Sequence, residues 1–150
     1  MREKIDCFMP CSDVDDIKDT LHELRQSKTI QHISLLTSGE CNIAEDEVKD
    51  CTLVHSDGLT STRTLLDIEA HTDAEFVLLN LKATPVSLGL HALERMLRVA
   101  TDSGAGMVYA DSYVKKNETT ERHPVIDYQT GSVRDDFDFG QLVLIRASLL

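Results

Sequence analysis

Residues 51–111 read CTLVHSDGLTSTRTLLDIEAHTDAEFVLLNLKATPVSLGLHALERMLRVATDSGAGMVYAD, and this stretch decides the fold class of the chain. Short apolar runs, typical of buried strands, alternate in it with longer segments whose apolar residues recur at helical spacing. The pattern predicts strand, helix, strand, helix and strand over Cys51–Val54, Thr60–Ala70, Glu75–Leu79, Ser87–Ser103 and Met107–Ala110. Such an alternation is typical of an α/β fold, a mostly parallel sheet with helices on both faces.

The same alternation continues towards the N-terminus. We expect a strand over Lys4–Pro10, a helix N-cap at Ser12 and an amphipathic helix that reaches Leu24. A second strand follows over Ile30–Leu36, and Thr37-Ser38-Gly39-Glu40 reads as a turn.

The character of the chain changes after Ser112, where strand-like segments follow one another without helices. Lys115–Glu121 is polar and turn-like, Arg122–Tyr128 reads as extended, and Gln141–Arg146 reads as a strand. We therefore expect a C-terminal β-hairpin elaboration. Because Arg146–Leu150 look like the opening of a helix, we expect residues 1–150 to be a single domain truncated at its C-terminal end.

Composition narrows the class of protein and of partner. A formal net charge of −11 without a local basic stripe argues against nucleic-acid binding. Apolar runs such as Phe76–Leu79 are too short to span a bilayer, and the first residues lack the apolar stretch of a signal peptide, so we expect a cytoplasmic protein. The four cysteines have no zinc-ligand spacing and are expected to be reduced and structural; they are Cys7, Cys11, Cys41 and Cys51.

Six segments together resemble the N-terminal part of family 2 glycosyltransferases of the GT-A fold. They are Ile5–Asp13, Gly58–Arg63, Ala70–Leu79, Leu93–Met96, Val108–Asp111 and Gly140–Leu149. The resemblance implies a nucleotide-diphosphate-sugar donor, with a UDP-sugar favoured, and transfer of the sugar to a hydroxyl of a glycan or another acceptor. The base that deprotonates the acceptor would lie beyond Leu150, so we expect this fragment to be inactive alone and name no catalytic residue.

One departure from the resembled family concerns the metal. Those enzymes place an Asp-x-Asp after the strand that corresponds to Glu75–Leu79, and its carboxylates hold a divalent ion on the donor diphosphate. Here the place is taken by Asn80-Leu81-Lys82-Ala83-Thr84, which contains no carboxylate. Lys82 could instead supply a fixed positive charge. A manganese or magnesium ion would need a non-standard acidic site, with Asp111, Asp136 and Asp138 as the candidates.

The resemblance implies that several strand exits bind the nucleotide-sugar. The candidates are Pro10, Ser12, Asp57, Arg63, Asn80, Lys82 and Asp111. Three of them also have a structural interpretation: Ser12 as a helix cap, Asp57 as a turn residue before Gly58, and Arg63 as a cover of helix surface. Asp111 could contact the sugar or a metal, or bond the turn that follows it.

Two other classes of protein fit parts of the pattern. The carboxylate-free Asn80–Thr84 window favours a GT-A-like module that binds nucleotide, glycan or protein without turnover. A receiver-like signalling domain would also place Asp57 and Lys82 at strand exits, but it needs an acid pair directly after the first strand, where Pro10-Cys11-Ser12 stands.

Overall fold

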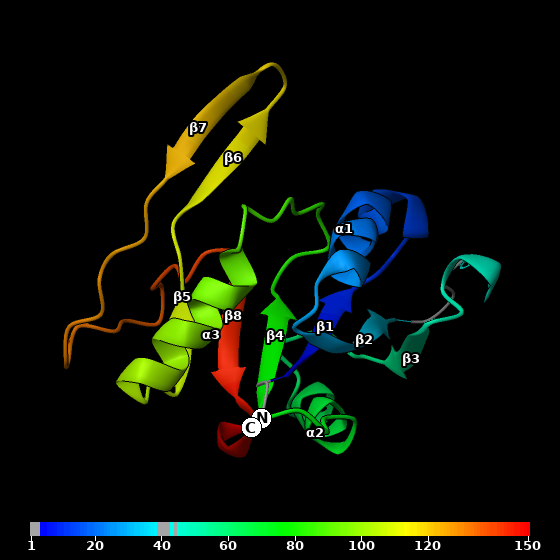
Figure 1. Ribbon diagram of the computed structural model, residues 1–150, viewed down its shortest axis with the longest axis horizontal. Coiled ribbons are helices and arrows are strands. Elements are labelled where there is room, and N and C mark those ends of the chain that lie inside the picture. The colour runs from blue at the N-terminus through cyan, green and yellow to red at the C-terminus, as the bar shows by residue number, and fades with distance from the viewer. Residues whose placement is uncertain (1–3, 39–42, 44) are drawn as a thin grey trace.

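The structure, a computed structural model, describes residues 4–38, 43 and 45–150. Its strands form a six-stranded sheet in the order β3-β2-β1-β4-β8-β5 and a separate two-stranded hairpin, β6-β7 (Figure 1). The strands are β1 (Ile5–Pro10), β2 (Ile30–Thr37), β3 (Cys51–His55), β4 (Phe76–Asn80), β5 (Met107–Tyr109), β6 (Ser112–Lys116), β7 (Thr119–His123) and β8 (Leu142–Arg146). The α-helices are α1 (Val14–Gln26), α2 (Thr62–Ala70) and α3 (Ala92–Ser103), and short 3-10 turns cover Glu45–Glu47 and Ala147–Leu149.

The sheet is mainly parallel, which confirms the expected α/β class. Strands β1 to β4 pair in parallel, whereas β8 runs antiparallel between β4 and β5. Since β8 is antiparallel to both neighbours, β5 points the same way as β4. The chain builds β2 and β3 on one side of β1 and then places β4 on the other side, so the strand order reverses between β1 and β4.

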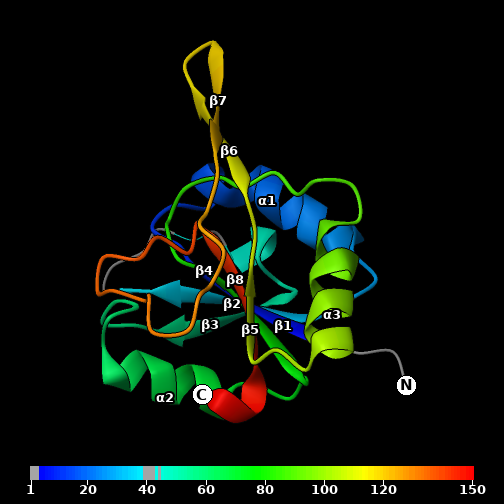
Figure 2. The same ribbon diagram turned by 90° about the vertical axis from the view of Figure 1, so that its left-hand side faces the viewer.

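Helices cover both faces of the sheet, and a separate core fills each interface. Helices α1 and α3 lie on one face, while α2 lies on the other (Figures 1 and 2). Successive side chains of β4 point to opposite faces of the sheet and so show this division. Phe76 and Leu78 belong to the first core, and Val77 and Leu79 belong to the second. Burial on both faces is why β4 reads as a continuous apolar run. No helix in the described residues is long and apolar enough to cross a membrane.

Helix α3 begins later than the sequence predicts. Its amphipathic pattern is as expected, with Leu93, Met96, Leu97 and Ala100 buried, but its first residue is Ala92 rather than Ser87. Residues 81–91 form a loop instead, because α1 offers them side-chain hydrogen bonds.

Two α1 side chains fasten this loop. Thr20 Oγ1 donates to the Val86 carbonyl and accepts from the Val86 amide, each at 2.8 Å. Glu23 accepts from the Ser87 hydroxyl at 2.7 Å and from the Leu88 amide. The loop after β4 is therefore fixed against α1 rather than continued into α3.

Helix α1 begins one residue later than expected. Its N-cap is Asp13, whose carboxylate accepts from the Asp15 amide at 3.0 Å, so Ser12 is not the cap. The expected turn after β2 includes Gly39 and Glu40, which lie outside the described residues, as does Cys41. No disulfide joins Cys7, Cys11 and Cys51 to one another, and burial raises the pKa of the Cys7 thiol to about 12.

The expected C-terminal hairpin is present, but its strands lie earlier than the sequence suggests. The polar stretch Lys115–Glu121 contains most of the hairpin, with Lys116 paired to Thr119 around the turn. Asn117 at that turn has φ +53°, which an asparagine tolerates better than most residues. The hairpin projects from the body of the domain (Figures 1 and 2).

Candidate functional site

Strands β1, β3, β4 and β5 all end at the same edge of the sheet, which we call the carboxyl edge. In open α/β sheets ligands bind at this edge, at the point where the strand order reverses. Here that point lies between the ends of β1 and β4, at Pro10 and Asn80. Asp57 follows β3, and three strand spacings, roughly 14 Å, separate β3 from β4. Asp111 follows β5, two spacings beyond β4 on the other side.

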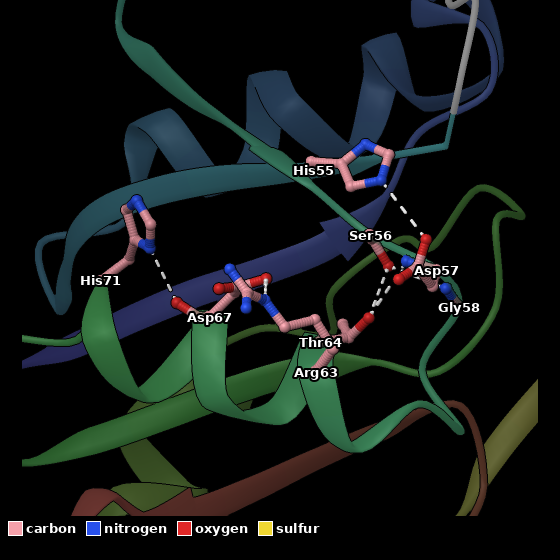
Figure 3. Close-up of polar contacts among 8 residues, drawn as sticks. All are labelled: His55, Ser56, Asp57, Gly58, Arg63, Thr64, Asp67 and His71. Carbon is pink, nitrogen blue, oxygen red and sulfur yellow. Dashed lines mark hydrogen bonds and ion pairs between the residues drawn. The ribbon is translucent and has the colours of Figure 1, made fainter.

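The corner between β3 and α2 holds Asp57 through its backbone (Figure 3). The Asp57 amide donates to Thr64 Oγ1 at 3.2 Å, and the buried Ser56 hydroxyl lies 3.2 Å from that oxygen. The Gly58 amide donates to Ser56 Oγ at 3.1 Å, and Gly58 takes φ +100°, which glycine adopts without strain. The exposed Asp57 carboxylate contacts His55 Nε2 at 3.3 Å and otherwise faces solvent. The corner thus fixes the main chain and leaves the carboxylate accessible.

Arg63 lies in the first turn of α2 but points along the helix. Its Nε donates to Asp67 Oδ2 at 3.1 Å, an i,i+4 ion pair, and Figure 3 shows the side chain running towards Asp67 rather than Asp57. In this structure Arg63 thus forms an ion pair along the surface of α2, and its contact with a nucleotide-sugar stays a prediction.

Pro10 and Ser12 lie at the exit of β1, beside the point where the strand order reverses. Pro10 is the last residue of β1 and pairs with Leu36 of β2. The Cys11 amide donates to the Leu36 carbonyl at 2.9 Å, which ties this exit to β2. Ser12 is exposed there, immediately before the Asp13 cap.

The exit of β4 is organised by a residue that sequence reasoning did not single out, Gln141. Its Nε2 donates to Asn80 Oδ1 at 3.1 Å, to the Thr84 carbonyl at 2.9 Å and to Thr84 Oγ1 at 2.8 Å. The Lys82 amide also donates to Asn80 Oδ1, at 3.3 Å. Nothing in the sequence pattern relates Gln141 to this window, because the contact depends on β8 pairing with β4.

The amide group of Asn80 is buried and fixed in one orientation. Asn80 Oδ1 accepts hydrogen bonds from Gln141 Nε2 and from the Lys82 amide, so Nδ2 must lie on the side of the amide group away from these donors. This Nδ2 has no hydrogen-bond partner in the described part of the chain. Asn80 borders a cavity of about 10 Å³ lined mainly by apolar side chains, including Met9 and Leu142. A carboxylate at position 80 would thus have one oxygen buried without a hydrogen-bond donor from the described residues.

The two candidate acids near the base of the hairpin are already engaged by neighbouring groups. Asp111 accepts from the Val125 amide at 2.9 Å and from Arg122 at 3.1 Å, and the amide bond and Arg122 lower the pKa of this carboxyl. Asp138 accepts from the Gly140 amide at 2.8 Å. The Asp111 bonds join the residue before β6 to β7 and to the segment after it, while contact of Asp111 with a sugar or a metal stays a prediction.

Asp138 lies among groups that are positively charged or can become so. His123 Nε2 lies 2.7 Å from Asp138 Oδ2. The Gly140 amide, His123 and, more weakly, nearby Lys82 lower the pKa of the Asp138 carboxyl. Asp136 instead forms an exposed ion pair with Arg134 at 3.0 Å.

Three aromatic residues near the base of the hairpin form a cluster. Phe137 and Phe139 are half-buried and pack with each other and with Tyr109 at ring-centroid distances of 4.6–5.9 Å.

The donor groups at the β4 exit do not fit the divalent ion that the resembled enzymes use. Hard cations require oxygen ligands, usually with one or two carboxylates among them. Over residues 4–38, 43 and 45–150 no group of three or more His, Cys, Asp or Glu side chains could hold a metal. The neutral oxygens of Asn80 and Thr84 converge on the NH2 group of the Gln141 amide, whose hydrogens carry positive partial charge.

Comparison with known proteins shows similarity of fold. No protein-family model matches the chain, and no curated protein matches it in sequence. Among solved structures, it is similar to CMP-2-keto-3-deoxy-manno-octonic acid synthetase complexed with CTP, with a TM-score of 0.57 and 11% identity over 98% of this chain and 76% of that one. It is also similar to 4-diphosphocytidyl-2C-methyl-D-erythritol synthase, with a TM-score of 0.56 and 14% identity over 99% and 77%.

A third similar structure is glucosyl-3-phosphoglycerate synthase from Mycobacterium tuberculosis in complex with Mn²⁺, UDP and phosphoglyceric acid. The TM-score is 0.50 and the identity 13%, over 99% of this chain and 57% of that one. At such identities the similarity shows the fold alone. The chain has the GT-A-like, Rossmann-like fold of nucleotidyl- and glycosyltransferases.

Proposed function

We propose that this chain is the nucleotide-sugar-binding domain of a glycosyltransferase similar to family 2. A UDP-sugar is the favoured donor, and a hydroxyl of a glycan or another molecule is the acceptor. The observation that carries the proposal is the reversal of strand order between β1 and β4, which leaves the polar exits of β1, β3 and β4 along one edge. Similar structures with CTP or UDP bound have the same fold.

Asp57 is the residue best placed to recognise the nucleoside. Its main chain is held by Thr64 and the buried Ser56, while its carboxylate is exposed at the end of β3. A carboxylate fixed in this way can accept hydrogen bonds from a ribose hydroxyl or a base N–H. The diphosphate would then lie towards the β1 and β4 exits.

The reaction proposed for the protein is a displacement at the anomeric carbon. The acceptor oxygen forms a bond to that carbon as the bond to the diphosphate oxygen breaks. The nucleoside diphosphate leaves with the bonding electrons, and the hydroxyl proton passes to a general base.

The first test is binding of UDP and UDP-glucose to the 150-residue chain, followed by amide NMR spectra. We expect shifts at residues 10–13, 57–58 and 80–84, and about ten-fold weaker binding for Asp57→Ala, the loss of one hydrogen bond to a charged group. Asp19→Ala, which removes an exposed carboxylate in the middle of α1, should bind as the wild type does. Shifts confined to other surfaces, or no binding of any nucleoside diphosphate, would refute the proposal.

A second candidate function is nucleotide or glycan binding without turnover. The observation that favours it is the absence of carboxylates from the Asn80–Thr84 window. It predicts the same spectral shifts, but no transfer or hydrolysis of a bound UDP-sugar by the full-length protein over long incubation with mixed sugar acceptors. Release of free UDP above the rate seen without protein would contradict it.

A further inference from the structure

We propose that the chain binds the donor diphosphate without a divalent ion, with the Gln141 amide in the ion's place and the Lys82 ammonium supplying the positive charge. The inference rests on the proposed function and specifies how its site treats the phosphates. It starts from the three oxygen atoms that converge at the β4 exit.

These oxygens are Asn80 Oδ1, the Thr84 carbonyl and Thr84 Oγ1, all within 2.8–3.1 Å of Gln141 Nε2. A bound cation would need the same oxygens turned towards it. Here an amide nitrogen with two hydrogens satisfies them, so an ion could enter only after these hydrogen bonds break. Because the oxygens are neutral, they offer little charge in return.

Gln141 is held in this place by the sheet. The Leu81 amide donates to the Gln141 carbonyl at 2.8 Å, and the next residue, Leu142, pairs with Asn80. The insertion of β8 between β4 and β5 thus determines which side chain faces the window. A carboxylate at position 80 would also have one oxygen buried where the Asn80 amide nitrogen has no partner, which makes the usual metal ligand costly there.

Lys82 supplies the charge that an ion would otherwise bring. Its side chain is exposed two residues after the end of β4, and its ammonium has no ion-pair partner among the described residues. A lysine can bind phosphate as a point charge without metal. The backbone of Lys82 is fixed, because the preceding residue, Leu81, donates its amide to the Gln141 carbonyl and the Lys82 amide donates to Asn80 Oδ1.

The first experiment measures binding of UDP and CDP by calorimetry, in EDTA and in excess Mn²⁺. We expect affinities that agree within about two-fold between the two conditions, and a loss of about ten-fold or more in Lys82→Ala, equivalent to one charge-assisted contact. The matched control is Lys28→Ala, which removes an exposed lysine between α1 and β2, at the opposite edge of the sheet.

A second experiment examines the metal without any nucleotide, so that the two proposals fail separately. Mn²⁺ alone should not selectively broaden the amide signals of residues 80–84 in the wild type. In Gln141→Glu, also without nucleotide, a carboxylate oxygen joins the three neutral oxygens, and we expect saturable broadening at residues 80–84. Selective broadening in the wild type, or none in Gln141→Glu, would overturn the place assigned to the amide.

The outcomes of the two experiments distinguish failure of this inference from failure of the proposed function. Nucleotide binding that needs Mn²⁺ would overturn this inference and leave the proposed function standing. Binding that is independent of Mn²⁺ but unchanged in Lys82→Ala would overturn the role of Lys82. Absence of binding in both conditions would refute the proposed function, and this inference with it.

Discussion

The buried carboxyl group of Asp6 should be one of the most important polar groups for the stability of the domain. It lies in β1 with 1% of its surface exposed. Its Oδ2 accepts from the Asp73 amide at 2.7 Å and from the Ala74 amide at 2.9 Å, which joins the loop between α2 and β4 to the centre of the sheet. Its Oδ1 lies 3.1 Å from Nδ1 of the half-exposed His32.

The magnitude follows from the groups left behind in Asp6→Ala. Two backbone N–H groups lose an acceptor, and a buried donor without a partner costs about 1–3 kcal/mol. The contact with His32 adds little because water can replace it. We therefore expect a loss of about 2–5 kcal/mol in the free energy of unfolding, a large part of the roughly 5–15 kcal/mol typical of a domain.

Urea denaturation followed by circular dichroism measures this loss. With an m-value of about 2 kcal/mol/M, the midpoint should fall by roughly 1–2.5 M. The matched control is Asp19→Ala, which removes an exposed carboxylate and should change stability by less than about 0.5 kcal/mol. A midpoint shift below about 0.3 M in Asp6→Ala at unchanged m-value would show that this reasoning is wrong.

Three smaller predictions concern other parts of the domain. Thr20→Val removes the hydroxyl that makes both bonds to Val86, so it should cost about 1–3 kcal/mol and speed amide hydrogen exchange in residues 81–91; unchanged exchange would contradict the assigned fastening. Gly104→Ala forces a Cβ into the left-handed conformation (φ +68°) that ends α3 and should cost about 1–2 kcal/mol by thermal unfolding; no loss would refute the strain. The folded-state pKa of Asp138 lies below its ordinary value, so the stability that this carboxylate contributes is complete above about pH 4 and is lost as the pH falls through the folded pKa. Asp138→Asn should therefore reduce the loss of unfolding free energy on the acid side. An identical dependence of stability on pH in the variant would exclude the His123 and amide contacts as the cause of that loss.

The sequence allows candidate residues to be named where their location depends only on their position after a predicted strand. Pro10, Asp57, Asn80 and Asp111 each follow an apolar run, and parallel strands bring such exits to one edge. What each side chain does there depends on partners far away in sequence. The sequence predicts Asp111 as a sugar contact or as a turn bond, and only the tertiary structure shows that Arg122 and Val125 donate to its carboxylate.

The sequence by itself determined the elements and their fold class. Strand β4 is a continuous apolar run and α3 carries its apolar residues at helical spacing, because the periodicity of burial is a local property of the chain. It also determined that residues 80–84 contain no carboxylate.

Only the tertiary structure decided the direction of β8 and the contacts that follow from it. The apolar pattern of Leu142–Arg146 predicts a strand but not its neighbours, since pairing across about sixty residues depends on what the rest of the sheet leaves unpaired. That pairing places the Gln141 amide against Asn80 and Thr84. Tertiary contacts of α1 also explain why residues 87–91 are not helical. Hydrogen bonds of the 81–91 loop to Thr20 and Glu23 outweigh a weak local helix preference. The chemistry of the site thus depends on long-range packing, which local pattern does not encode.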